Sequence, residues 1–331
     1  MKKALVLGAG GFIGHHLVSR LKAEGYVVIG ADQKMPAFGP SKADDFRLGD
    51  LREYAFCEHL LKQAVDEVYQ LAADMGGAGY LFTGENDFDV MHNSSRINLN
   101  VARAAVQHQP QQLFFSSSAC VYPKRNQADP TAPNCEEASA YPADPDSEYG
   151  WEKLFSERLY QNARHNYGLN VRIARFHNVY GPGNDYATDK AKAPAAICRK
   201  VAEAEDGASI EIWGDGQQTR SFLYIEDCLD GIQALMRSQA TGPLNIGSEE
   251  LISLNDFARM VIRLSGKTLT LEHVDGPVGV QGRTSDNRLV TASTGWQPAF
   301  RLEEGLRETY RWVAERVSAD QSIPSHRPSN A

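Results

Sequence analysis

Residues 1–33, MKKALVLGAGGFIGHHLVSRLKAEGYVVIGADQ, decide the fold of this chain. Residues 4–8 form an apolar run typical of a buried strand, residues 11–24 have helical periodicity, and residues 27–32 form a second strand-like run. The turn between the first strand and the helix, Gly8-Ala9-Gly10-Gly11-Phe12-Ile13-Gly14, lets the backbone bend tightly. A strand, a helix and a strand in this order predict the start of a parallel sheet covered by helices.

The glycine-rich turn also predicts a nucleotide site. Backbone N–H groups at a helix N-terminus are unpaired and favour an anion such as a diphosphate. Asp32, which ends the second strand, would accept a hydrogen bond from a ribose 2′-hydroxyl and repel a 2′-phosphate, so we expect NAD rather than NADP. A helix cap followed by a solvated aspartate is the alternative. The expected coenzyme contacts are Gly8, Gly11, Phe12, Ile13, Gly14 and Asp32, with Asp50 and Leu51 near the adenine and Leu71, Ala72 and Ala73 after the third strand.

The alternation of strands and helices continues through the first half of the chain. Helices are expected at residues 54–63, 95–107 and 149–167, and strands at residues 67–73, 112–116 and 170–175. This pattern predicts an α/β fold, a Rossmann-like doubly wound parallel sheet, with an NAD-binding domain over residues 1–178.

After residue 178 the elements become shorter and more mixed. Helices are expected at residues 193–204, 254–265 and 302–317, and strands at residues 211–213 and 221–224. We expect residues 179–317 to form a smaller C-terminal substrate-binding lobe, with some later segments returning to the first domain. Residues 318–331, which are rich in Ser and Pro, are predicted to be a disordered tail.

The composition indicates which classes of partner and which cellular compartment are expected. Among 331 residues, 34 Lys and Arg stand against 42 Asp and Glu, and this net charge of −8 disfavours a nucleic-acid or anionic-membrane partner. No apolar stretch approaches the ~20 residues of a membrane span, and the run after Lys3 is too short for a secretory signal. Five scattered cysteines without a Cys-x-x-Cys pair indicate neither a disulfide framework nor a metal site. We therefore expect a cytoplasmic protein without a bound metal.

A tyrosine and a lysine mark the predicted catalytic centre. Tyr149 and Lys153 are four residues apart, which places both side chains on one helix face. A nearby ammonium and a cationic nicotinamide would stabilise the phenolate and make Tyr149 a proton acceptor. Ser118 lies at the end of a predicted strand, the edge where parallel sheets bind ligands, and could bind the same substrate oxygen. A surface pair of side chains is the alternative.

Together these features resemble the extended short-chain dehydrogenases/reductases, many of which modify nucleotide sugars. Two later segments, RFHNVYGP at residues 175–182 and WGDGQQTRSF at residues 213–222, are similar to the sugar-nucleotide-binding segments of that group. The resemblance covers residues 1 to about 317. It implies a nucleotide-sugar substrate and a homodimer paired through the helices at residues 95–107 and 149–167.

Four stretches resemble the GDP-mannose 3,5-epimerase family more narrowly. They are ADMGG at residues 73–77, SACVYP at residues 118–123, KAPAA at residues 192–196 and GRTSDN at residues 282–287. The resemblance assigns Cys120 and Lys192 to an acid/base pair that acts beside Tyr149, Lys153 and Ser118. Read alone, the cysteine would be a small buried side chain and the lysine a solvated one. The substrate contacts that the resemblance implies are Gly76, Ser118, Cys120, Asn178, Lys192, Ala193, Lys200, Gln218, Arg220 and Arg283.

The expected activity is NAD-dependent nucleotide-sugar epimerisation, most closely that of a GDP-mannose 3,5-epimerase. Transient oxidation at C4 would acidify the hydrogens at C3 and C5, which could then be exchanged before C4 is reduced again. A 4,6-dehydratase is disfavoured because Ala119 and Cys120 stand where that group carries an Asp-Glu pair. Another nucleotide-sugar 4-epimerase or a 4-keto-sugar reductase/epimerase remains possible within this class. A non-catalytic NAD-sensing scaffold is the alternative from another class.

Overall fold

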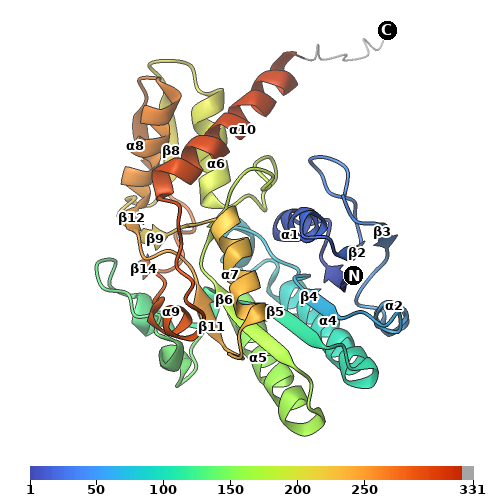
Figure 1. Cartoon of the computed structure of the whole chain (residues 1–331). Helices are drawn as coiled ribbons and strands as arrows, with labels where there is room; N and C mark the ends of the chain where they lie inside the picture. Colours follow the sequence, from blue (N-terminus) through green and yellow to red (C-terminus); the bar gives the residue numbers. More distant parts are fainter. Residues whose placement is uncertain (323–331) are drawn as a thin grey trace.

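A seven-stranded parallel sheet lies at the centre of the computed structural model, which describes residues 1–322 (Figure 1). Its strand order is β11-β6-β5-β4-β1-β2-β3. The bounds are β1 (Lys3–Leu7), β2 (Val27–Asp32), β3 (Asp45–Leu48), β4 (Glu67–Gln70), β5 (Gln112–Ser118), β6 (Val171–Phe176) and β11 (Leu244–Ile246). Leu5 of β1 stands opposite Ile29 of β2 and Val68 of β4. The predicted Rossmann-like α/β fold is confirmed.

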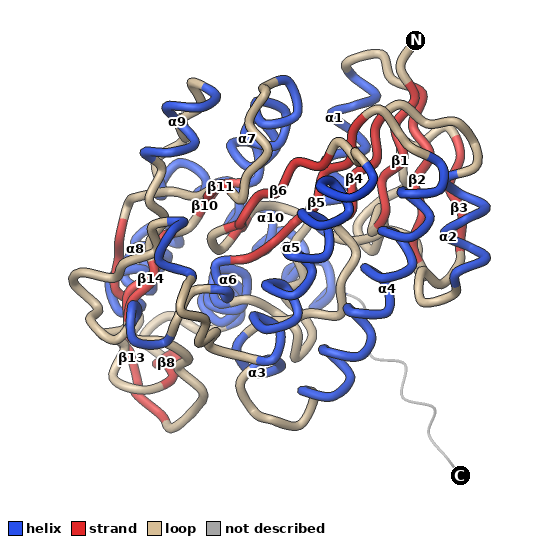
Figure 2. The backbone as a smooth tube through the Cα atoms, turned by 90° about the horizontal axis from the view of Figure 1, so that it is seen from below, coloured by secondary structure: helices blue, strands red, loops and turns tan. Residues whose placement is uncertain are grey.

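Alternation along β1 separates two hydrophobic cores. Ala4 and Val6 belong to one cluster of buried side chains, and Leu5 and Leu7 to the other. Helices α1 (Phe12–Ala23) and α7 (Ile225–Arg237) contribute to the first core, while α2 (Tyr54–Leu61), α4 (Asp87–His108) and α5 (Glu148–Tyr167) contribute to the second (Figure 2). Because successive side chains of a strand point to opposite faces, an apolar run in a doubly covered sheet feeds both cores.

A smaller lobe stands over the ends of β5 and β6 (Figure 1). Its helices are α6 (Ala193–Glu203), α8 (Leu254–Ser265) and α10 (Leu302–Ser322), whereas α9 (Arg288–Thr294) contacts β11 and α7. Its short strands form three small sheets: β8 (Ser209–Trp213) with β13 (Thr270–Val274), β7 (Val179–Tyr180) with β10 (Leu223–Tyr224), and β9 (Thr219–Ser221) between β12 (Leu251–Ser253) and β14 (Gly282–Arg283). Short helical segments α3 (Ala78–Leu81), η1 (Ala119–Val121), η2 (Lys124–Gln127) and η3 (Glu137–Ala140) complete the described elements.

The structure departs from the sequence-based expectation at several elements. Helix α4 begins at Asp87 instead of residue 95, and the strand expected at residues 221–224 is divided between β9 and β10, which belong to different sheets. The return of later segments to the first domain, in contrast, was part of the expectation: strand β11 pairs with β6, and helix α7 packs into the first core.

The prediction of a disordered tail over residues 318–331 is wrong for residues 318–322. Helix α10 continues through Ser322, so residues 318–322 are helical, and Val317 packs into the core just before them. The rest of the predicted tail, residues 323–331, lies outside the described residues. Within residues 1–322, no helix is long and apolar enough to cross a membrane.

Candidate active site

The glycine-rich turn brings helix α1 against the end of β1. Gly8 has a φ of +85°, in the left-handed region that favours glycine. A Cβ at Gly14 would lie 2.1 Å from the carbonyl oxygen of Gly8, so no side chain fits between the helix and the turn. Gly11 caps the helix without any side-chain hydrogen bond, which leaves the first amides of α1 available to a diphosphate. These observations fit the dinucleotide site that the sequence predicts.

Asp32 lies beside this turn, at the end of β2. Its Oδ2 accepts a hydrogen bond of 2.9 Å from the backbone N–H of Gly10, and its Oδ1 accepts one of 3.2 Å from that of Lys34. The carboxylate is thus fixed where a ribose would follow the diphosphate. The carboxylate of Asp50 accepts more hydrogen bonds than that of Asp32, because the guanidinium of Arg52 donates to both of its oxygens at 2.7–3.0 Å.

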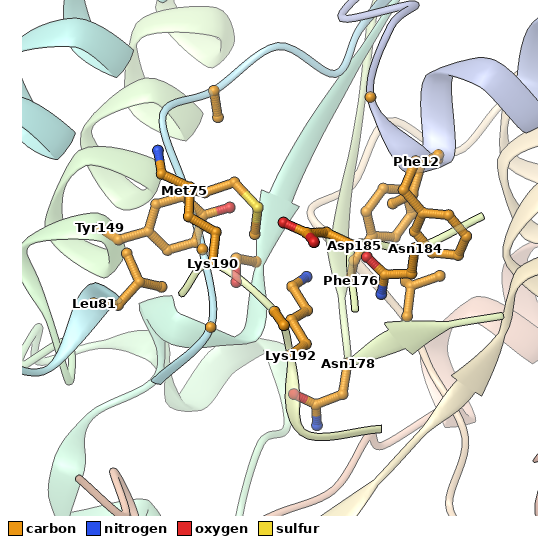
Figure 3. Close-up of a pocket in the computed structure, with 18 of the residues that line it drawn as sticks. Phe12, Met75, Leu81, Tyr149, Phe176, Asn178, Asn184, Asp185, Lys190 and Lys192 are labelled. Atoms are coloured by element: carbon orange, nitrogen blue, oxygen red, sulfur yellow. The ribbon is translucent and has the colours of Figure 1, made fainter. Parts of the chain in front are cut away.

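One cavity of about 820 Å³ connects the end of the sheet with the smaller lobe. All of the residues predicted to bind the coenzyme or the substrate, or to act in catalysis, line it. Figure 3 shows Tyr149 on one side of this cavity, Phe12, Asn184 and Asp185 on the other, and Lys192 between them. The carboxyl ends of parallel strands meet at this edge, which explains why residues far apart in the sequence come together.

Tyr149 and Lys153 lie one turn apart in α5, close to the end of β5. The Oγ of Ser147 begins this helix by accepting a hydrogen bond of 3.2 Å from the N–H of Gly150. Lys153 donates a 2.8 Å hydrogen bond to the carbonyl oxygen of Ser116, and its Nζ lies 5.5 Å from the centre of the Tyr149 ring. Both side chains are buried, so the pair is not the surface pair that was the alternative.

Burial governs the protonation of this pair. It raises the pKa of the Tyr149 phenol well above the ordinary value, and the electrostatic effects of the neighbouring Cys120 and Glu152 add to that shift, whereas a hydrogen bond with Ser118 opposes it. Burial also lowers the pKa of the Lys153 ammonium. From the sequence, the Lys153 ammonium and a cationic nicotinamide are expected to stabilise the phenolate together, and the burial of the phenol makes that second positive charge necessary.

Cys120 follows β5 directly and lies next to the catalytic helix. Ser118 fixes this turn, because its Oγ accepts a 3.2 Å hydrogen bond from the backbone N–H of Cys120. A Cβ at Gly150 would lie 2.1 Å from the carbonyl oxygen of Cys120, so only glycine allows α5 to come this close. The thiol consequently lies beside Tyr149, within the same small cluster of buried side chains.

Lys192 reaches the cavity from the start of α6, in the smaller lobe (Figure 3). The backbone there is held by Gly77, whose N–H donates a 3.0 Å hydrogen bond to the carbonyl oxygen of Lys190. Burial lowers the pKa of the Lys192 ammonium and raises that of the Cys120 thiol. Both shifts favour neutral groups, a thiol that can donate a proton and an amine that can accept one.

The predicted substrate residues of the smaller lobe have distinct surroundings. Arg220 donates its hydrogen bonds to two backbone carbonyl oxygens, at 2.8 and 3.1 Å, and burial lowers its pKa to about 9. A negatively charged ligand would relieve this cost. Gln218 has a buried Oε1 without a hydrogen-bond partner, so it can still accept one from a ligand. Asn178 and Lys200 donate to the carbonyl oxygens of Ser221 and Glu211, at 2.8 and 2.9 Å.

The remaining predicted substrate residues are Gly76, Ala193 and Arg283. Gly76 is buried, and Ala193 is exposed at the rim of the cavity. Arg283 pairs with the buried carboxylate of Asp146, so part of its hydrogen-bonding capacity is already used within the protein. Its contact with the substrate stays a prediction.

Sequence reasoning missed two groups: Lys190, which lines the cavity, and Asp146, which pairs with the cavity-lining Arg283. Lys190 lies 3.1 Å from Asp74 and 3.9 Å from the centre of the Tyr80 ring, and this contact joins the loops after β4 and β7. Asp146 was also missed. It stands only three residues before Tyr149 in a run of polar residues, and nothing in its local pattern distinguishes it from a solvated turn residue.

No group of three or more His, Cys, Asp and Glu side chains in residues 1–322 is arranged to hold a metal ion. The five cysteines, all of which lie in this part of the chain, are free and buried.

Comparison with known proteins identifies the family to which the chain belongs. Residues 4–247 match the model of the NAD dependent epimerase/dehydratase family. The chain is 42% identical over 322 residues to GDP-mannose 3,5-epimerase of Arabidopsis thaliana, an alignment that covers 97% of this chain and 84% of the plant protein. It is 40% identical over 319 residues to GDP-mannose 3,5-epimerase 1 of Oryza sativa subsp. indica, with 96% and 83% covered.

The solved structures agree with this assignment. UDP-glucuronic acid 4-epimerase from Bacillus cereus, solved in complex with UDP-glucuronic acid and NAD, superposes with a TM-score of 0.81 at 26% identity, and the match covers 95% of this chain and 99% of the other. Sequence, fold and cavity lead to one assignment: the chain belongs to the NAD dependent epimerase/dehydratase family and uses NAD as its cofactor.

Proposed function

We propose that this protein is an NAD-dependent nucleotide-sugar epimerase that acts on GDP-mannose and exchanges the protons at C3 and C5. The observation that carries this proposal is the presence of a thiol, Cys120, and an amine, Lys192, in the same cavity as the buried pair of Tyr149 and Lys153. A simple 4-epimerase needs only the tyrosine and the coenzyme. A second acid/base pair is useful when C–H bonds next to a carbonyl must be broken.

Tyr149 would act first. When bound, oxidised NAD supplies a hydride acceptor for C4 of the sugar and a positive charge beside the phenol. Tyr149 takes the proton of the 4-hydroxyl, which leaves a ketone at C4. Lys153 holds the end of β5 through the carbonyl oxygen of Ser116 and keeps its own charge close to the ring. Ser118 would orient the 4-oxygen.

Cys120 and Lys192 would then act on the carbons beside the ketone. The ketone acidifies the hydrogens at C3 and C5, because the electron pair left by deprotonation spreads onto the C4 oxygen. One of the two groups removes the proton, and the other delivers a proton to the opposite face, which inverts the carbon. Tyr149 would finally give its proton back to the C4 oxygen, and the Gly8–Gly14 turn would hold the reduced coenzyme, which supplies the hydride that restores the alcohol.

Solvent deuterium exchange tests this function directly. When the enzyme is incubated with GDP-mannose in deuterated water, we expect deuterium at C5, at C3 or at both, detected by mass spectrometry and NMR. Recovery of unlabelled sugar from protein that binds NAD would reject GDP-mannose as the substrate. A panel of nucleotide sugars assayed in the same way separates the alternatives, since a 4-epimerase changes C4 without taking up deuterium at C3 or C5.

We further infer that two copies of the chain form a homodimer through α4 and α5, which lie side by side (Figure 1). Leu99 of α4 is 47% exposed, and Trp151 and Phe155 of α5 are 40% and 47% exposed. These large apolar side chains are exposed on neighbouring helices, and a second copy would cover them. The five free thiols are consistent with a reducing, cytoplasmic setting, which is part of the same proposal.

The dimer can be tested with a pair of matched leucines. Leu99→Glu places a charge within the proposed interface, so we expect it to convert the dimer into monomers in sedimentation or light-scattering measurements. Leu289→Glu on α9, where the leucine is 45% exposed, is the control and should leave the assembly unchanged. A wild-type chain that is monomeric at high concentration would contradict the proposal.

A further inference from the structure

Asp146 is a buried carboxylate that neither the motifs nor the proposed reaction uses. It lies just before α5, and its Oδ2 pairs with Nη2 of Arg283, which belongs to β14 in the smaller lobe. Only 1% of the Asp146 side chain and 7% of the Arg283 side chain are exposed. The other carboxylate oxygen accepts a 2.9 Å hydrogen bond from the hydroxyl of Ser147. An ion pair with so little exposure is held in a fixed geometry.

The guanidinium of Arg283 has two further partners that fix its orientation. Its Nε donates a 2.6 Å hydrogen bond to Oε1 of Gln127, and its Nη1 lies 3.4 Å from Sγ of Cys120. The amide of Gln127 is itself anchored, because its Nε2 donates a 2.9 Å hydrogen bond to the carbonyl oxygen of Tyr122. The positive charge of the guanidinium is therefore held against the thiol on one side and against a carboxylate on the other.

We propose that Asp146 is a positioning residue for Cys120: it anchors the Arg283 guanidinium beside the thiol and balances its positive charge, so that the thiol remains protonated in the resting enzyme. The use of this proton donor in catalysis rests on the proposed function. The charge arrangement itself rests only on the contacts of these three side chains.

The sign of the effect follows from the groups around the sulfur. The titratable and charged groups that face it are Asp146, Tyr149, Lys153, Lys192, Arg220 and Arg283. Burial is the largest cause that raises the pKa of Cys120, the charge of Asp146 raises it further, and the charge of Arg283 lowers it. Removal of the carboxylate alone leaves the guanidinium unbalanced, which favours the thiolate.

Alkylation of the thiol measures this effect without reference to turnover. We would treat the NAD-loaded enzyme with iodoacetamide across a range of pH and follow modification of Cys120 by peptide mass spectrometry. Only the thiolate reacts, so the midpoint of the rate against pH reports the pKa. The other four cysteines are buried in the hydrophobic cores and serve as internal references.

Asp146→Asn should lower the midpoint by about one pH unit or more, which corresponds to about tenfold faster alkylation below both midpoints. Asp144→Asn, two residues earlier in the same loop, is the matched control and should leave the midpoint unchanged. Asp146→Glu keeps the charge and should stay close to the wild type. If Asp146 acted only through packing, Asp146→Asn would not lower the midpoint of alkylation relative to Asp146→Glu.

Arg283→Gln provides the opposite test and is decisive if Asp146→Asn does not fold. It leaves the carboxylate beside the thiol without its cation, so the midpoint should rise. The double variant should return towards the wild type. An unchanged midpoint in Arg283→Gln overturns the proposal. If the variants shift the midpoint but the wild-type enzyme does not exchange deuterium into GDP-mannose, the charge arrangement stands and the proposed function is rejected. If the wild-type enzyme exchanges deuterium but the variants leave the midpoint unchanged, only the role of Asp146 is rejected.

Discussion

Cys120→Ala should abolish deuterium uptake at C3 and C5, with a loss of about 10²–10⁴-fold, while NAD stays bound. The expectation follows from the position of the thiol, which lies beside Tyr149 and lines the cavity that Lys192 enters from the other lobe. Without the thiol, one face of the sugar has no proton donor or acceptor, so a carbon that loses its proton cannot be inverted. The measurement is NMR of GDP-mannose after incubation in deuterated water.

A second cysteine controls for the loss of a buried sulfur. Cys57 of α2 is fully buried in the second hydrophobic core, and Cys57→Ala should lower stability without changing the isotope pattern. Full retention of C3 and C5 exchange in Cys120→Ala would contradict the assignment of the thiol. Retained inversion at C4 alone would identify a 4-epimerase.

Tyr149→Phe should reduce every step that begins with oxidation at C4, again by about 10²–10⁴-fold, because Tyr149 is the group that takes the hydroxyl proton in the proposed reaction. The phenol is buried next to Lys153 and Ser118, so its loss removes a proton carrier and leaves the fold of α5 in place. Single-turnover absorbance of the reduced coenzyme measures the first step, and deuterium uptake measures the steps that follow it.

Tyr160→Phe is the matched control on the same helix. Tyr160 is fully buried, and its hydroxyl donates a 3.2 Å hydrogen bond to Oδ1 of Asn98. Its removal should cost about 1 kcal/mol of stability without affecting turnover. If Tyr149→Phe binds NAD and keeps full activity, the catalytic account is wrong. A non-catalytic NAD-sensing scaffold would be supported if the wild-type protein bound NAD and showed no exchange with any nucleotide sugar.

The first strands and helices could be predicted closely because their signals are local. The second strand is predicted at residues 27–32 and is found there, since a continuous apolar run ends at Asp32, the last residue of the strand. Helix α8 was likewise predicted with the bounds it has, because its apolar face repeats regularly and Ser253 caps its start. Such patterns depend on neighbouring residues alone.

Other elements depend on partners that are distant in the sequence. The first turns of α4 are polar, and only their packing in the folded protein, where Val90 joins the cluster of Cys120 and Tyr149, identifies them as helix. The three residues of β11 are too few for a period-2 signal. Their identity as a strand comes from pairing with β6.

The candidate site shows the same division. The glycine turn, Asp32, Tyr149 and Lys153 could be found from spacing, because the chemistry requires them at fixed positions relative to one strand or helix. Cys120 and Lys192 came from the family resemblance. Neither spacing nor the family resemblance could reveal the Asp146–Arg283 ion pair, because it forms only when β14 packs against the start of α5.

Strand β11 comes much later in the sequence than its partner β6, and this order affects folding during synthesis. While the ribosome is still synthesising the smaller lobe, the outer edge of β6 has no neighbour, because Leu244–Ile246 has not yet emerged from the exit tunnel. The nucleotide-binding half therefore cannot complete itself as an early, independent folding unit. A nascent chain of this kind presents an unpaired strand edge to its surroundings while the segment between β6 and β11 is synthesised, and fragments that stop before residue 244 should aggregate.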